Sequence, residues 1–306
     1  MTLLLPPGLD VGAATHTGRV RTNNEDDFLV WSPATGQDPQ RGALFVVADG
    51  LGGMVGGAEA SRTAVRGLAT RFVAAQIGEP VELRMREAFD AASRAVAEVS
   101  RQQPQLRGMA TTLTALHVSG DRFVLGHVGD SRCYRLRNGR LEVLTTDHVL
   151  QQGGHHLTRC IGAGREQENA DIASDTLRPG DVYLLATDGL WNVLTAATIV
   201  QALQRNEPIA AAVELVRASH QAGGPDNCTA VVVGIRRRPA DDPRRAVEIA
   251  PEEPRLGPER LQPGADLRTP RWPWLLLAVA IVLLAVSGAK EFLGFDVFAE
   301  WLRRAR

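Results

Sequence analysis

The sequence of 306 residues has few cysteines, almost no lysine and no marked excess of either charge. Its three cysteines, Cys133, Cys160 and Cys228, are too few for a disulfide framework, and no two have the spacing of a metal-binding pair. This cysteine usage indicates a protein of a reducing compartment. Lys290 is the single lysine, so the basic residues are nearly all arginine. The apolar fraction of 44% is that of an ordinary globular chain.

The net charge of −1 is unevenly distributed. Residues 236–306 contain 13 basic and 10 acidic residues, a net charge of +3, whereas residues 1–235 contain 21 and 25, a net charge of −4. A nucleic-acid-binding domain of this size normally carries a basic excess. The acidic first part therefore argues against nucleic acid as a partner.

Composition divides the chain into four parts, which are residues 1–235, 236–271, 272–289 and 290–306. The first carries dense strand and helix patterns and is long enough for one large domain. The second holds seven prolines and little apolar content, which is typical of a flexible linker. The third is 18 residues without a charge, close to the shortest length that spans a bilayer, and Trp272 and Trp274 mark its interfacial end. We expect a single transmembrane helix there, followed by a short amphipathic tail.

A buried core helix is the alternative for residues 272–289, and the proline-rich linker disfavours it because no domain adjoins the segment. Basic residues are equally frequent on its two sides, so the positive-inside rule gives no orientation. The N-terminus has no basic region and an apolar run of only three leucines, so we expect no secretory signal.

Hydrophobic patterns predict an α+β domain. Expected strands are residues 43–49, 111–118, 122–128, 132–136, 141–145, 182–187 and 228–235. Expected helices are residues 58–76, 81–102, 195–204 and 209–221. Asn138-Gly139 is a two-residue hairpin turn. Because strands outnumber helices and several are joined by short turns, we expect a mainly antiparallel sheet with helices packed outside.

Acidic residues recur where apolar runs end. Asp49, Asp130, Asp188 and Asp226 are each followed by turn residues, and an acidic stretch at residues 24–27 precedes another apolar run. An isolated aspartate in such a place is usually a turn former. Several carboxylates gathered at one end of a sheet repel one another, and a divalent cation is the usual compensation. Oxygen ligands favour Mg²⁺ or Mn²⁺ over zinc.

A carboxylate site with two hard cations suits phosphoryl chemistry, because the ions activate a water and neutralise phosphoryl oxygens. Arg21 stands four residues before Glu25, and its planar guanidinium can hold phosphate in a bidentate manner. A cysteine-based phosphatase is excluded, since no cysteine has an arginine six positions later. The glycines of residues 50–57 follow neither nucleotide-binding pattern.

Seven motifs occur in the order found in one enzyme family. They are Gly18–Asp26, Val47–Gly53, Gly108–Leu113, Gly129–Arg132, Leu144–His148, Ala186–Gly189 and Gly224–Asn227. Over residues 10–235 the chain resembles the bacterial branch of the metal-dependent type 2C (PPM-type) Ser/Thr protein phosphatases. The resemblance implies two packed antiparallel sheets flanked by helices, an α-β-β-α sandwich. It also implies hydrolysis of phosphoserine and phosphothreonine in proteins, in opposition to a bacterial Ser/Thr kinase.

The resemblance implies a site for two core Mn²⁺ or Mg²⁺ ions. Asp49 would bridge the ions and the backbone carbonyl of Gly50 would bind one of them. Asp188 and Asp226 would complete the shell of the other, and Glu25 would act through a bound water.

Four further roles follow from the same resemblance. Asp26 would order the outer shell of the ions, and Arg21 would hold the phosphate. Asp130 matches the position of a third, weaker ion in bacterial members. Asn227 would position the loop around Asp226.

The chain departs from the family pattern in two places. Met54 stands where bacterial members usually have a histidine, and the flap after Asp147-His148 is shortened to residues 149–156. A shortened flap changes which phosphopeptides fit. We interpret His155 and His156 as surface residues and not as metal ligands.

Two other functions remain open. The domain could be a membrane-tethered module that binds phosphoproteins without turnover, or a hydrolase of small phosphate metabolites. The presence of Asp49, Asp188 and Asp226 favours catalysis. Because phosphoproteins and the metal ions are cytosolic, we expect a single-pass inner-membrane protein whose catalytic domain faces the cytoplasm.

Overall fold

The computed structural model describes residues 5, 8–33, 41–51, 56–76, 78–150, 156–236 and 248–249. These residues belong to one compact unit, Met1–Arg255. The predicted membrane segment, the tail and most of the predicted linker lie outside the described residues. None of the helices within the described ranges is both long and apolar enough to cross a membrane.

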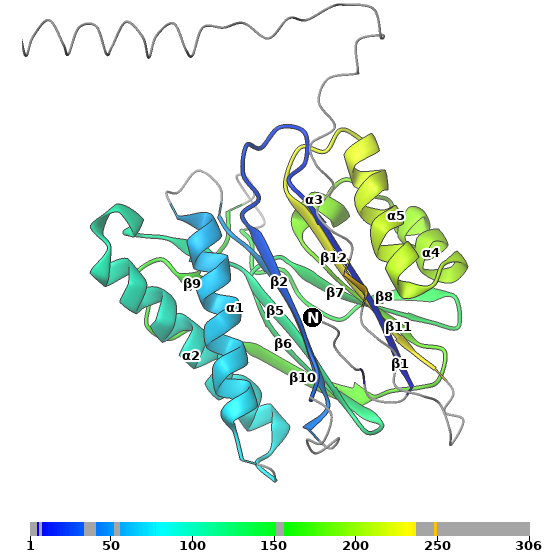
Figure 1. Cartoon of the computed structure of the whole chain (residues 1–306), viewed down its shortest axis with the longest axis horizontal. Helices are drawn as coiled ribbons and strands as arrows, with labels where there is room; N and C mark the ends of the chain where they lie inside the picture. Colours follow the sequence, from blue (N-terminus) through cyan, green and yellow to red (C-terminus); the bar gives the residue numbers. More distant parts are fainter. Residues whose placement is uncertain are drawn as a thin grey trace, which may run out of the picture. The chain divides into compact units, whose positions relative to one another are not determined.

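Two β-sheets form the centre of the domain (Figure 1). The larger has six strands in the order β13-β1-β12-β11-β7-β8, with bounds β1 (Leu9–His16), β7 (Arg132–Arg137), β8 (Arg140–Val143), β11 (Val182–Ala186), β12 (Cys228–Ile235) and β13 (Glu248–Ile249). The smaller has the order β10-β6-β5-β3-β2, with bounds β2 (Asp26–Trp31), β3 (Ala43–Asp49), β5 (Leu113–Ser119), β6 (Arg122–Val128) and β10 (Asp171–Thr176). Two short strands, β4 (Ala110–Thr111) and β9 (Ile161–Gly162), pair separately. Within these sheets every neighbouring pair is antiparallel except β1–β13.

Helices cover the outer face of each sheet (Figure 1). The five-stranded sheet packs against α1 (Gly57–Ala74) and α2 (Val81–Gln102). The six-stranded sheet packs against α3 (Asp188–Trp191), α4 (Ala196–Arg205) and α5 (Pro208–Gln221). The result is the expected α-β-β-α order of layers.

Strand β3 shows why several of the predicted strands are continuous apolar runs. Its side chains alternate between two cores: Phe45 and Val47 face the other sheet, whereas Leu44 and Val46 face α1 and α2. All four are fully buried. A strand that is covered on both faces needs apolar residues at every position. Such runs therefore predict the central strands well.

The expected elements agree closely with the observed ones. Residues 43–49, 81–102, 122–128 and 228–235 have the bounds of β3, α2, β6 and β12. Five strands, β1, β2, β9, β10 and β13, were not predicted. Strand β10 lies at a sheet edge and is largely exposed, so it lacks the alternation that identifies a strand. Residues 248–249, inside the predicted linker, form β13.

Candidate active site

One antiparallel strand pair brings the first acidic group together. Strand β2 begins at Asp26, which lies opposite Asp49, the last residue of β3. The backbone N–H of Gly50 donates to the carbonyl oxygen of Glu25 at 3.1 Å. Register alone therefore places residues 25–26 beside residues 49–50, at the end of the five-stranded sheet.

The six-stranded sheet supplies the second acidic group. Asp188 starts α3 directly after β11, and Asp226 lies between α5 and β12. The expectation that Asp226 follows an apolar strand is wrong, because it precedes one. Because β12 pairs antiparallel with β11, the start of β12 lies beside the end of β11. Asp226 therefore reaches the same edge as Asp188. In Figure 1 this edge is at the top, beside α3 and the loop between β1 and β2.

Asp26 joins the two sheets. Its Oδ2 accepts hydrogen bonds from the hydroxyls of Thr187 at 2.8 Å and Thr229 at 2.6 Å, both from the six-stranded sheet side. Neither threonine was predicted to be a site residue. The sequence feature that could have identified Thr229 is its polar side chain within the otherwise apolar, buried strand β12.

Burial and mutual repulsion both disfavour the ionised carboxylates at the strand ends, and burial has the larger effect. Burial raises the pKa of Asp49 well above its ordinary value, and the charges of Asp26, Asp188 and Asp130 raise it further, as does a hydrogen bond with Asp188. Burial also raises the pKa of Asp26 to about 7, although the hydrogen bonds from Thr229 and Thr187 oppose the shift. A divalent cation stabilises all the ionised forms at once.

The donors at this edge fit a hard cation better than zinc. They are carboxylates, and Oδ1 of Asp26 is buried without a hydrogen-bond partner in the described part of the chain. However, no three His, Cys, Asp or Glu side chains among the described residues are close enough to complete a metal site by themselves. A bound ion would need backbone and water oxygens as well, which Mg²⁺ and Mn²⁺ accept readily.

Asp130, whose charge contributes to the raised pKa of Asp49, is 6% exposed. The next residue, Ser131, shares a hydrogen bond of 2.7 Å with the hydroxyl of Thr112. The same hydroxyl accepts from the N–H of Asp49 at 2.9 Å. Thr112 and Ser131, which the sequence analysis missed, therefore connect the Asp130 loop to the backbone of Asp49.

Arg21 reaches the same edge from the loop between β1 and β2. Its Nη2 donates to Oδ2 of Asp226 at 2.7 Å, and each side chain is about one-third exposed, at 38% and 32%. Asn227 fastens this loop: its Oδ1 accepts from the N–H of Glu25 at 2.8 Å. Its Nδ2 donates to the carbonyl oxygens of Thr17 at 2.7 Å and Asn23 at 2.9 Å.

The structure describes only part of the two departures from the family pattern. Met54 and His155 lie outside the described residues. His156 is exposed, as a surface residue should be. Val149 and Leu157 form an isolated antiparallel bridge at the base of the shortened flap.

Gly189 permits the close approach of the start of α3 to the backbone of Asn227. A β-carbon at this position would lie 2.0 Å from the carbonyl oxygen of Asn227. We expect Gly189→Ala to lower the free energy of unfolding by about 1–3 kcal/mol, because backbone atoms must move apart. Denaturant unfolding measures this change, and Gly234→Ala is a matched control for the loss of a glycine. Neither Gly189 nor Gly234 has a positive φ, and a β-carbon on Gly234 would lie no closer than 3.3 Å to its nearest neighbour, a side-chain atom of Pro208. Equal stability of both variants would contradict the close-approach argument.

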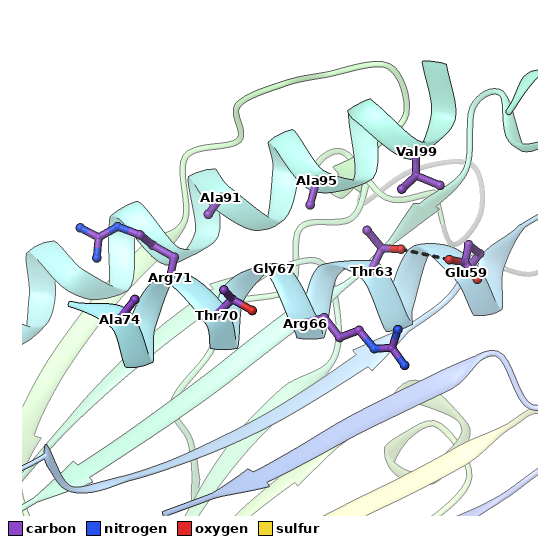
Figure 2. Close-up of a pocket in the computed structure, with 10 residues that line it drawn as sticks. All are labelled: Glu59, Thr63, Arg66, Gly67, Thr70, Arg71, Ala74, Ala91, Ala95 and Val99. Carbon is purple, nitrogen blue, oxygen red and sulfur yellow. Dashed lines mark hydrogen bonds between the residues drawn. The ribbon is translucent and has the colours of Figure 1, made fainter. Parts of the chain in front are cut away.

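A separate groove lies between α1 and α2 (Figure 2). Its floor is formed by small residues, Gly67, Ala91 and Ala95. A β-carbon on Gly67 would lie 3.1 Å from atoms of both Ala92 and Ala95, so the helices cross closely at this point. The groove shares no lining residue with the carboxylate edge.

The sandwich with carboxylates from both sheets at one edge defines a candidate metal-dependent phosphatase. A family model, "Protein phosphatase 2C", matches residues 15–226. The chain belongs to the protein phosphatase 2C family.

Relatives and solved structures agree with this assignment. Over 243 residues the chain is 32% identical to the serine/threonine protein phosphatase PstP of Mycobacterium tuberculosis, covering 74% of this chain but only 45% of the relative. It is 28% identical over 253 residues to protein phosphatase PhpP of Streptococcus pneumoniae, covering 76% of this chain and all of that one. The catalytic domain of PstP, solved in complex with two manganese ions, has a TM-score of 0.65 at 33% identity, covering 75% of this chain and 99% of that one.

Proposed function

We propose that the domain hydrolyses phosphoserine and phosphothreonine in proteins, using a water activated by two Mn²⁺ or Mg²⁺ ions. The observation that carries the proposal is the meeting of Asp49, Asp188 and Asp26 at one edge of the sandwich with Arg21 beside them. Family membership and relatives named as Ser/Thr protein phosphatases support it.

Each residue of the edge has a part in this reaction. Asp49, Asp188, Asp226 and the carbonyl of Gly50 would hold the two ions. When bound, the ions supply a water of lowered pKa and positive charge next to the phosphoryl oxygens. Arg21 binds two of those oxygens and orients the phosphorus atom for in-line attack.

The supporting residues keep this arrangement rigid, because a hydrogen-bonded frame holds the reacting groups in place before substrate arrives. Asp26 fixes the two sheets to each other through Thr187 and Thr229. We include Glu25 as a ligand acting through water and Asp130 as the holder of a third, weaker ion. Asn227 holds the loop that carries Arg21.

We also propose that residues 272–289 anchor the protein in the inner membrane, with the domain in the cytoplasm opposite a Ser/Thr kinase. The support is the uncharged 18-residue stretch behind a proline-rich linker. A reporter enzyme fused after Arg306 tests the orientation. Activity only outside the cytoplasm supports a single crossing, and cytoplasmic activity overturns it.

Turnover by the full chain tests the enzymatic proposal. We expect hydrolysis of p-nitrophenyl phosphate with Mn²⁺ and its loss in EDTA, because the water is then no longer activated. A phosphothreonine peptide should be cleaved faster than the matching phosphotyrosine peptide. Hydrolysis of small phosphate esters without peptide cleavage would indicate a metabolite phosphatase. Phosphopeptide binding without turnover would indicate a binding module.

A further inference from the structure

The last residue of β1, His16, is buried at the start of the turn that carries Arg21. Its side chain is 4% exposed, and its Nδ1 accepts a hydrogen bond from the backbone N–H of Gly18 at 2.8 Å. An imidazole nitrogen accepts only when it carries no proton, so the proton of the neutral ring is on Nε2. The ring packs edge-on against His220 of α5, with centroids 4.8 Å apart.

Gly18 is packed closely against the loop before β12. Its φ is +80°, and a β-carbon would lie 2.2 Å from the carbonyl oxygen of Asp226. The next residue, Arg19, donates its N–H to the carbonyl oxygen of Gly224 at 2.7 Å. The turn is therefore held on one side by the loop before β12 and on the other by the His16 ring.

This turn determines where the guanidinium of Arg21 lies. Only two residues, Arg19 and Val20, separate Gly18 from Arg21, whose Nη2 reaches Asp226 at 2.7 Å. A change in the direction of the chain at Gly18 therefore moves Arg21 relative to the carboxylates. Asn227 holds the two ends of the same turn through the carbonyl oxygens of Thr17 and Asn23.

We propose that His16 is a positioning residue for Arg21: by accepting the Gly18 N–H it fixes the turn that presents the guanidinium to the substrate phosphate. The inference rests on the proposed function for the role of Arg21, and it assigns His16 no contact with substrate. A buried histidine that only filled space would be replaceable by an apolar residue of similar size. A histidine that acts through its acceptor is replaceable by another acceptor.

Two substitutions separate these cases. His16→Leu removes the acceptor, and we expect KM for a phosphopeptide to rise about threefold to tenfold, the effect of one lost hydrogen bond, with little change in kcat. In His16→Asn the side-chain oxygen can accept the N–H two residues later, so most of the affinity should return. His117→Leu is the matched control, because His117 is also buried and its Nε2 is hydrogen-bonded to the Arg41 carbonyl in another part of the domain.

A double-mutant cycle shows whether His16 acts through Arg21. In an Arg21→Ala background, His16→Leu should change KM no further. Calorimetric binding of inorganic phosphate to the full chain with Mn²⁺ gives a second readout that needs no turnover, and His16→Leu should weaken it by the same factor. Thermal melts of every variant check that it is folded.

Three results overturn the inference: unchanged phosphate affinity in His16→Leu, equal defects in the Leu and Asn variants, or an effect of His16→Leu that persists without Arg21. Absence of turnover by the wild-type chain is a different result. It overturns the proposed function, while phosphate binding still decides the role of His16.

Discussion

Replacing Asp49 by asparagine is expected to abolish turnover, lowering kcat roughly 10³-fold or more in saturating Mn²⁺. A neutral amide would hold a cation more weakly than a carboxylate does, so the activated water and several kcal/mol of charge stabilisation would be lost together. Steady-state hydrolysis of p-nitrophenyl phosphate measures the effect. Asp121→Asn, which changes an exposed aspartate in a hairpin turn, is the matched control and should keep full activity.

The same substitution should not weaken the fold. Burial and the charges of Asp26, Asp188 and Asp130 raise the pKa of Asp49, so its ionised form is disfavoured in the folded protein. A neutral asparagine removes this repulsion. In EDTA at neutral pH, we therefore expect Asp49→Asn to unfold at a denaturant concentration equal to or above that of the wild type. If Asp49→Asn were inactive and also strongly destabilised, the loss of activity could be explained by the loss of the fold. That result would refute the assignment of Asp49 as a metal ligand whose charge destabilises the folded protein.

Removing the guanidinium of Arg21 has the second largest expected effect. Arg21→Ala should lower kcat/KM about 10²-fold, because charge-assisted hydrogen bonds to phosphate contribute about 1.5–3 kcal/mol each. Arg21→Lys should recover only part of the loss, since an ammonium cannot make the same two parallel bonds. Phosphopeptide kinetics at fixed Mn²⁺ measures both.

Arg19→Ala is the control for charge in the same turn. Arg19 is exposed, and a solvent-exposed charge contributes little, so its loss should change kcat/KM less than about threefold. Equal effects of Arg19→Ala and Arg21→Ala would show that the turn contributes only a diffuse positive potential.

The sequence predicts the parts of this protein that depend on local pattern. Apolar runs buried on both faces identify β3, β6 and β12, and a carboxylate at the end of such a run identifies Asp49. Strand β10 escapes prediction because its stability comes from pairing with β6 at the sheet edge and not from a buried face.

Contacts between distant segments could not be predicted in this way. Asp26 meets Thr187 and Thr229, which are 161 and 203 positions away in the sequence. The local hydrophobic pattern of a sequence does not show which side chain will hydrogen-bond to a carboxylate once two sheets have packed together. Asp226 was misplaced for the same reason: its turn reads like the end of a strand, but it stands before β12.

The ion pair between Arg21 and Asp226 links phosphate binding to the presence of the metal ions. Without ions, the negative charge of Asp226 is directed at the guanidinium, whose Nη2 lies 2.7 Å from Oδ2. A cation held by the same carboxylate would offset that charge, so the guanidinium would be more available to a phosphate oxygen once the ions are bound. The chain with ions and the chain without them would therefore differ in their affinity for inorganic phosphate.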